Sequence, residues 1–167
     1  MPSCRAWAEH ESTRLKEESA MPKPYASAVI NATADEVWSY VRDFGNIAEW
    51  LPSIETCEIE DQGDGGGGSG VGAVRRLTGA GDAVFRERLV ALSDADRSLS
   101  YDFVESPFPV RRQRSTIRVA PVTDTGQAFV EWSGEFDADA GDEERMTKIF
   151  AKAVYAAGLD GLRKHFG

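Results

Sequence analysis

The stretch Thr33-Ala-Asp-Glu-Val-Trp-Ser-Tyr-Val-Arg-Asp-Phe44 places a helix near the start of the chain, ahead of a long region of strand character. Thr33 and Glu36 have the spacing of a capping box, in which the threonine hydroxyl accepts from the Glu36 amide and the Glu36 carboxylate reaches back to Thr33. Apolar residues then follow at helical spacing: Val37, Trp38, Tyr40, Val41 and Phe44. We therefore expect a helix that begins directly after Thr33.

A strand precedes this helix and a second short helix follows it. Tyr25 to Asn31 has strand character, and the segment Met21-Pro-Lys-Pro24 before it would break any helix. Gly45-Asn46 interrupts the first helix. The second helix is expected to contain Ile47, Trp50 and Leu51 and to end at Pro52.

From Ile54 to Phe136 the apolar residues alternate with polar ones, which is the period of a strand. Turn signals divide this region into six antiparallel strands; they lie at residues 63–72, 78–82, 93–96, 107–109 and 123–126. Phe85, Glu87 and Leu89 share one face of their strand, and Tyr101 and Phe103 share one face of the next. The alternation predicts a sheet with one covered face and one solvated face.

The cover is expected to be a helix from about Asp142 to Phe166. Acidic residues at its start and basic residues at its end match the helix dipole. Its apolar stripe consists of Met146, Ile149, Phe150, Ala153, Val154, Ala157 and Leu162.

The 167 residues have the usual size of one domain, which we place at residues 25–167. Residues 1–24 are polar, and we expect them to form a disordered extension; the change of character makes Met21 a candidate natural start. No apolar run reaches the length of a membrane span or a signal peptide, and the cysteines, Cys4 and Cys57, have no spacing for a metal site. These features predict a cytoplasmic protein. The sequence leaves open whether it is a monomer or a homodimer.

A net charge of -9 argues against nucleic acid and anionic membrane surfaces as partners. One cluster of arginines is an exception to the negative charge of the chain. We interpret it as a solvated strand face balanced by nearby carboxylates, in preference to an anion-binding patch; its residues are Arg111, Arg112, Arg114 and Arg118.

Several short motifs occur in a characteristic order: Ala34 to Phe44, Trp50-Leu-Pro52, Gly72-Ala-Val-Arg75, Glu87-Arg-Leu89 and Asp94-Ala-Asp-Arg97. With these motifs, residues 25–166 resemble the START-like, or SRPBCC, superfamily of bacterial polyketide cyclases and dehydratases, birch-pollen-type allergens and plant abscisic acid receptors. The resemblance implies an α+β helix-grip fold. In it a seven-stranded curved antiparallel sheet wraps around a long C-terminal helix, and two short helices connect strands 1 and 2.

The resemblance also implies roles for particular residues. Glu87 matches the inward-facing glutamate that holds ordered water around the ligand of the plant receptors. Residues 78–83 resemble their gate loop, and Pro107-Phe108-Pro109 occupies the place of their latch. Where the receptors have a lysine that binds the hormone carboxylate, this sequence has Glu55, which would repel an acidic ligand and argues against a hormone receptor.

The residue inventory favours binding over common forms of catalysis. Both histidines, His10 and His165, lie near chain ends, and the lysines are confined to the tail and the terminal helix. No cluster has metal-ligand spacing, so we expect neither a metal nor a cofactor. The expected partner is a small hydrophobic molecule, with a site lined by Trp50, Phe85, Glu87, Leu89, Tyr101, Phe103, Phe108, Gln113, Ser115, Trp132, Phe150 and Val154.

The role of Glu87 is open on sequence grounds. Burial would raise its pKa unless Arg75 or Arg76 pairs with it. It could then act as the enolising base of a polyketide cyclase or dehydratase, with Tyr101 donating to the oxyanion. We favour a passive role for Glu87 as a hydrogen-bond partner. The residues expected beside it in the cavity are Tyr101, Gln113, Ser115, Trp132 and Tyr155.

A third hypothesis is a protein-interaction module, since START-like bacterial toxins and chaperone activators resemble this fold. The outward-facing Arg112 and Arg114 would then make the contact.

Overall fold

The computed structural model describes residues 20–167, so that Cys4, His10 and most of the predicted extension lie outside the described part. The elements in chain order are β1 (Tyr25–Ile30), α2 (Ala34–Val41), a 3₁₀ turn (Ile47–Glu49), β2 (Ile54–Asp61), β3 (Val74–Gly79), a second 3₁₀ turn (Ala80–Asp82), β4 (Val84–Ser93), β5 (Ser98–Glu105), β6 (Arg111–Pro121), β7 (Ala128–Asp137), α3 (Ala140–Lys148), a π-helical segment (Ile149–Ala156) and α4 (Ala157–Phe166).

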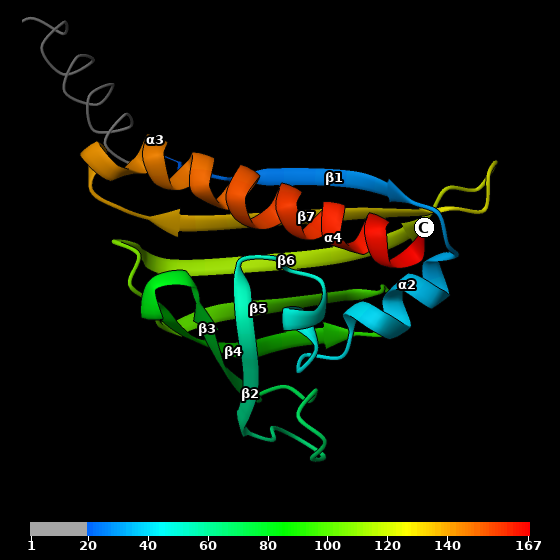
Figure 1. The fold of residues 1–167 in the computed structure, drawn as a ribbon, viewed down its shortest axis with the longest axis horizontal. Coiled ribbons are helices and arrows are strands. Elements are labelled where there is room, and N and C mark those ends of the chain that lie inside the picture. Colours follow the sequence, from blue (N-terminus) through cyan, green and yellow to red (C-terminus); the bar gives the residue numbers. More distant parts are fainter. Residues whose placement is uncertain (1–19) are drawn as a thin grey trace, which may run out of the picture.

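All seven strands form one antiparallel sheet in the order β1-β7-β6-β5-β4-β3-β2. Figure 1 shows that the sheet curves so strongly that β2 runs steeply across the direction of β7, while the C-terminal helix lies over β1, β7 and β6. The ladder between β1 and β7 extends from Tyr25 opposite Ser133 to Ile30 opposite Ala128. The predicted helix-grip fold is confirmed.

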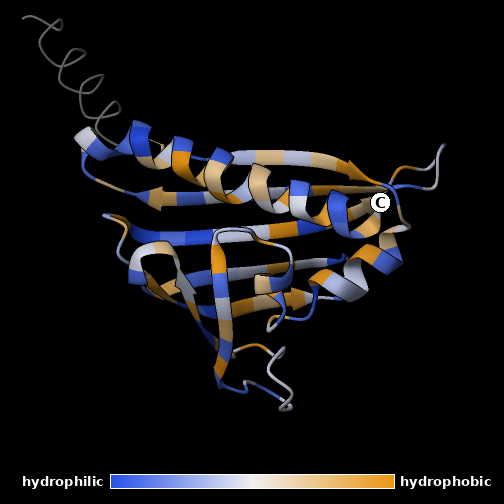
Figure 2. Ribbon diagram, in the orientation of Figure 1, coloured by the Kyte–Doolittle hydropathy of each residue, from blue (hydrophilic) through white to orange (hydrophobic). Residues whose placement is uncertain are grey.

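Side chains alternate between the covered and the solvated face of the sheet, and hydrophobic and hydrophilic residues follow one another along the strands in Figure 2. In β6, Gln113 and Ser115 are buried, whereas Arg114 and Arg118 are exposed. Arg114 pairs with Asp102 at 2.7 Å, and Arg112 pairs with Asp137 at 2.8 Å. The arginine-rich face is therefore charge-balanced at these positions, as expected.

Helix α2 begins with the predicted capping box. The Thr33 amide donates to Glu36 Oε2 at 2.8 Å, and the Glu36 amide donates to Thr33 Oγ1 at 3.3 Å. Further along, Trp38 Nε1 and Arg42 Nε both donate to Asp94 Oδ1 at 2.8 Å. Asp94 lies in the turn between β4 and β5, so this carboxylate fixes α2 against the end of the sheet.

The second predicted helix is a single 3₁₀ turn, Ile47–Glu49. Its apolar residues are buried as the spacing predicted, namely Ile47, Trp50 and Leu51. Asn46 holds the turn in place, because its Nδ2 donates to the Tyr40 carbonyl at 2.8 Å and its Oδ1 accepts from Trp50 Nε1 at 3.1 Å.

The terminal helix starts at Ala140, slightly before the predicted Asp142, and becomes π-helical over Ile149–Ala156. The wider turn of a π-helix brings residues i and i+5 to one side, and Phe150 and Tyr155 are both buried against the sheet. The predicted stripe assumed α-helical spacing throughout. Ala153 of this stripe is exposed but borders the cavity, and the stripe omits Tyr155.

Two glycines bring α4 into close contact with the segment after α2. A Cβ atom at Gly158 would lie 2.6 Å from Trp132 Cζ3, and one at Gly161 would overlap the carbonyl oxygen of Trp50. Only a residue without a Cβ permits this approach. The C-terminal end of the helix is thereby fixed on the core.

We expect Gly161→Ala to lower the free energy of unfolding by about 1–3 kcal/mol, because the added methyl group forces the helix away from Trp50. Gly141→Ala is the matched control, since nothing lies within 4 Å of its Cβ position in α3. Alanine there should be neutral or stabilising by about 0.5–1 kcal/mol. Urea unfolding of both variants measures the difference, and equal stabilities would contradict the close approach.

Candidate ligand-binding site

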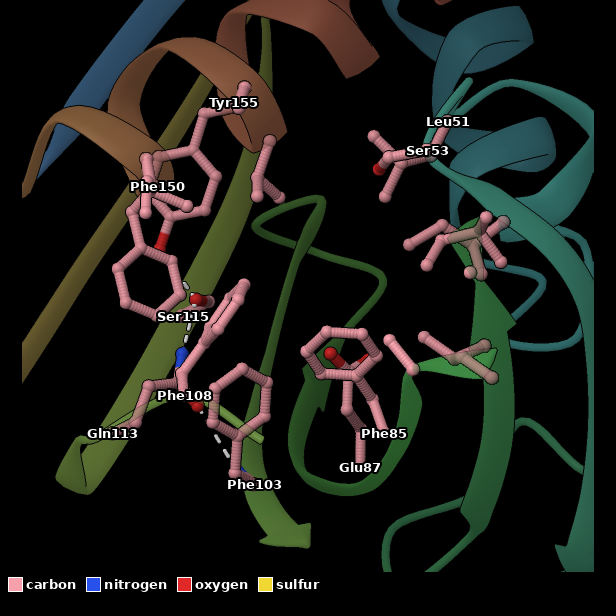
Figure 3. Close-up of a pocket in the computed structure, with 18 of the residues that line it drawn as sticks. Leu51, Ser53, Phe85, Glu87, Phe103, Phe108, Gln113, Ser115, Phe150 and Tyr155 are labelled. Atoms are coloured by element: carbon pink, nitrogen blue, oxygen red, sulfur yellow. Dashed lines mark hydrogen bonds between the residues drawn. The ribbon is translucent and has the colours of Figure 1, made fainter. Parts of the chain in front are cut away.

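A cavity of about 250 Å³ lies between the concave face of the sheet and the π-helical segment. Figure 3 shows that residues of β6 and the helix form one side, with Phe85 and Glu87 of β4 across from them and Leu51 and Ser53 beyond. The wall is mainly apolar, and its apolar side chains are Ile47, Leu51, Ile54, Leu77, Ala80, Ala83, Phe85, Phe103, Phe108, Ile149, Phe150, Ala153 and Val154.

The structure places nine of the twelve predicted site residues at this cavity: Phe85, Glu87, Tyr101, Phe103, Phe108, Gln113, Ser115, Phe150 and Val154. Trp50, Leu89 and Trp132 do not border it. The ring centroids of Trp50 and Trp132 are 5.5 Å apart, and Tyr155 stacks on Trp132 at 4.8 Å. These two indoles therefore fill the core, where Leu89 is also fully buried.

The sequence prediction missed a group of residues that border the cavity from the segment after α2, from β3 and from the helix. They are Ile47, Leu51, Ser53, Ile54, Leu77, Gly79, Ala80, Ala83, Ile149 and Ala153. For Leu77, strand parity was a usable signal, because Arg75 and Leu77 share a face of β3 and are both buried. Tyr155, expected from the sequence as a companion of Glu87, also borders the cavity, although it lies off the predicted α-helical stripe.

The loops that resemble gate and latch both contribute to the cavity. Gly79, Ala80 and Ala83 come from the first, and Phe108 comes from the second. Phe108 packs edge-on against Phe85 and Phe150, with centroid distances of 5.1 and 5.7 Å.

Glu55 behaves differently from the expectation. It is exposed at an irregular position of β2, between the paired residues Ile54 and Thr56, and does not border the cavity. Its charge therefore gives no reason for the cavity to repel an acidic ligand.

A buried ion pair lies at the edge of the cavity, which Glu87 borders and Arg75 does not. Arg75 and Glu87 lie opposite each other in the β3–β4 ladder. Arg75 Nε donates to Glu87 Oε2 at 2.8 Å, and its Nη2 lies 2.6 Å from the same oxygen. Both side chains are almost inaccessible, with exposed fractions of 4% and 7%.

The Arg75 guanidinium also contacts the segment after α2. Nη1 donates to the Phe44 carbonyl at 2.9 Å, and the group lies 3.9 Å from the centroid of the Phe44 ring. Burial raises the pKa of the Glu87 carboxyl above its usual value, while the positive charge and the hydrogen bond of Arg75 oppose this shift. Glu87 is thus the partner of a fixed cation and not an isolated carboxylate.

Polar side chains on the β6 side form a hydrogen-bonded chain. The Phe103 amide donates to Gln113 Oε1 at 3.1 Å, and Gln113 Nε2 donates to Ser115 Oγ at 2.6 Å. Ser115 Oγ lies 2.6 Å from the Tyr155 hydroxyl, and Trp132 Nε1 donates to the Tyr101 hydroxyl at 3.1 Å. Burial raises the pKa of the Tyr101 and Tyr155 phenols, so both remain protonated at neutral pH.

Residues 21–167 match the protein family described as polyketide cyclase / dehydrase and lipid transport. The chain belongs to this family. The predicted relationship to the START-like superfamily is therefore confirmed, over almost the same residues as the sequence motifs indicated.

Solved structures of similar proteins agree with this membership. The protein XoxI from Bacillus cereus is 29% identical with a TM-score of 0.76, over 87% of this chain and 96% of that one. A protein from Nitrosospira multiformis is 32% identical with a TM-score of 0.70, over 87% and 97%. Major latex-like protein 151 from Panax ginseng is 15% identical with a TM-score of 0.65, over 87% and 97%, and this likeness shows the fold alone.

Within residues 20–167 no group of three or more His, Cys, Asp or Glu side chains is arranged to hold a metal ion. In the same described part of this family member, no helix is both long and apolar enough to cross a membrane.

We expect Arg75→Met to lower the free energy of unfolding at pH 7 by about 3–5 kcal/mol, because Glu87 would remain buried without its counter-charge. The loss should shrink as the pH falls toward about 5. Without Arg75 nothing opposes the rise in the Glu87 pKa that burial causes, so the folded variant binds this proton more tightly than its unfolded chain does, and acid then favours its folding. Urea unfolding at both pH values measures the effect.

Arg86→Met is the control for this prediction. Arg86 of β4 also pairs with a glutamate, Glu60, but their side chains are 38% and 35% exposed. Its loss should be at most about 1 kcal/mol, with no recovery in acid. An equal loss in both variants would show that burial of the Arg75 pair is energetically unimportant.

Proposed function

We propose that this protein binds a small, mostly apolar molecule in the cavity between its sheet and its C-terminal helix. The observation that carries the proposal is the cavity itself, about 250 Å³ in volume and walled mainly by aromatic and aliphatic side chains. Apolar surface around a hollow of this kind favours an apolar guest, because the guest leaves water on binding. Membership of a family that includes lipid transport is consistent with it.

The size of the cavity limits the ligand. Small-molecule pockets usually measure about 300–1,000 Å³, so this one suits a compact molecule and not a long lipid chain. Aromatic rings define much of the space, since Phe103 lies within about 6 Å of both Phe85 and Phe150, measured between ring centroids. Flat rings or short branched chains fit such walls best.

Native mass spectrometry of freshly purified protein tests the proposal, with a co-purified small molecule as the expected result. Ala153→Phe should remove most of the bound molecule, because Ala153 borders the cavity and the larger side chain would occupy it. Ala156→Phe is the matched control, as Ala156 is exposed on the same π-helical segment and does not border the cavity. Equal loading of the two variants would place the molecule elsewhere.

A cyclase or dehydratase activity is the second candidate. It is favoured by the position of Glu87 at the cavity and by the raised pKa of its carboxyl. Glu87 would take a proton from the carbon next to a ligand carbonyl, and Tyr101, whose hydroxyl accepts from Trp132, would donate its own hydrogen to the enolate oxygen. The fixed cation of Arg75 weakens Glu87 as a base, which is why we rank binding first.

Glu87→Gln separates these two functions. If the protein is an enzyme, turnover of a synthetic linear triketone should fall by at least about 100-fold, because general-base catalysis contributes about 10²–10⁴-fold. Binding should be retained, since glutamine can still accept from Arg75. Cyclisation followed by absorbance measures turnover, and an unchanged rate would remove Glu87 as the base.

The protein-interaction hypothesis has less support. Arg112 and Arg114, which would make the contact, already pair with Asp137 and Asp102 on the sheet surface. A partner would have to compete with these ion pairs.

A further inference from the structure

The hydrogen bonds on the β6 side of the cavity leave hydrogen-bond donors without acceptors. Ser115 and Tyr155 bring one hydroxyl hydrogen each, and the contact between their oxygens at 2.6 Å uses one of the two. Ser115 Oγ also accepts from Gln113 Nε2, so the remaining hydrogen has to point away from this group. A further hydrogen bond to the Tyr101 hydroxyl would not change this count, because Tyr101 also brings one hydroxyl hydrogen. One hydrogen would still have no acceptor.

Gln113 adds a second surplus hydrogen. Its amide orientation is fixed, because Oε1 accepts from the Phe103 backbone amide and Nε2 must then face Ser115. One of the two Nε2 hydrogens goes to Ser115 Oγ. Among residues 20–167 the other has no acceptor within hydrogen-bonding distance. Gln113, Ser115 and Tyr155 all border the cavity, so these donors lie in its wall.

The packing around Tyr155 holds its hydroxyl in this position. The ring stacks on Trp132 with centroids 4.8 Å apart and 24° between the planes. A Cβ atom at position 134 would overlap the Tyr155 hydroxyl, and the glycine there leaves room for it against β6 and β7. In Figure 3 Tyr155, Ser115 and Gln113 follow one another along one side of the cavity, joined by hydrogen bonds. Such a fixed set of donors is preorganised for an acceptor.

The charge of the cavity wall narrows the choice of acceptor. Among the described residues that border the cavity there is no lysine, arginine or histidine, and Glu87 is the one ionisable carboxyl. The nearby cation, Arg75, is already paired with Glu87. A ligand carboxylate would therefore be buried without a counter-ion and close to a glutamate, which is unfavourable.

We infer that Gln113, Ser115 and Tyr155 form a subsite for the carbonyl oxygen of an uncharged ligand. This inference rests on the proposed function, because it assigns a polar group to the apolar molecule that the cavity would hold. The ligand class is then a compact ketone, ester or quinone whose apolar body lies against the phenylalanine-rich wall. Its oxygen accepts the hydrogens that the protein leaves unused.

Three probes that share one apolar body test the subsite: benzophenone, diphenylmethane and diphenylacetate. In the unmodified protein benzophenone should bind about tenfold more tightly than diphenylmethane, which is the size of effect that one hydrogen bond in a dry site can give. Diphenylacetate should bind most weakly. Quenching of tryptophan fluorescence on titration measures the three dissociation constants.

Tyr155→Phe should reduce the preference for benzophenone over diphenylmethane to about twofold or less, because it removes the hydroxyl and keeps the stacked ring. Ser115→Ala should reduce the preference to the same extent, because it removes the other hydroxyl of this contact. Tyr25→Phe is the matched control, since Tyr25 is 51% exposed and does not border the cavity, and the preference should persist.

The outcomes distinguish the subsite from the proposed function. If none of the three probes binds, the proposed function fails and the subsite fails with it. If benzophenone and diphenylmethane bind equally well, the cavity binds apolar molecules but the carbonyl subsite is refuted. Tightest binding of diphenylacetate would overturn the inference of an uncharged ligand.

Photochemistry provides a measurement that needs no variant. Under ultraviolet light the benzophenone carbonyl abstracts a hydrogen atom from a nearby C–H group, and the two radicals combine, so that the whole probe is added to the protein. Tryptic mapping should find the adduct on peptides 115–118 and 153–163, which contain Ser115 and Tyr155. An adduct confined to peptide 77–86, on the opposite wall, would contradict the inferred orientation.

Discussion

The buried pair of Arg75 and Glu87 is the interaction on which this end of the fold depends. One guanidinium joins β3 to β4 through Glu87, reaches the segment after α2 through the Phe44 carbonyl, and lies over the Phe44 ring. Three parts of the chain that are distant in sequence therefore meet at a single charge. The same contact keeps the cation out of the cavity lining, because Arg75 is buried beside Glu87 and does not border the cavity. Structural integrity and the electrical neutrality of the wall thus come from one pair of residues.

The cavity results from a difference between the two ends of the C-terminal helix. At its last turns Gly158 and Gly161 let the backbone approach Trp50 and Trp132 until no space remains. Earlier along the helix the π-helical turns present Phe150 and Tyr155 to the sheet, and the cavity lies between them and β4. A curved sheet and a helix in contact along only part of its length cannot be filled completely by side chains.

Much of this architecture could be predicted from sequence, since it depends on local signals. The capping box at Thr33, the alternation in β4 to β7 and the apolar stripe of the helix each fix an element by its own period. Three predicted site residues do not border the cavity: for the strand residues Leu89 and Trp132, parity shows which face a side chain occupies but not how far along the sheet the cavity extends, and Trp50 lies after the 3₁₀ turn. Trp50, Leu89 and Trp132 face inward and still lie in the solid core. Tyr155 was off the predicted stripe because a π-helical turn has no simple sequence signature.

One detail of the sheet has a wider consequence. The β5–β6 ladder ends at Asp102 opposite Arg114, and beyond it the Gln113 side chain, not a backbone carbonyl, receives the Phe103 amide. The last hydrogen bond between β5 and β6 therefore depends on a single side chain. A hydrogen bond between backbone groups survives almost any substitution. This one is lost when residue 113 has no side-chain oxygen at the position of Gln113 Oε1. The join between the ends of β5 and β6 therefore depends on the identity of residue 113, and a single substitution there would loosen it.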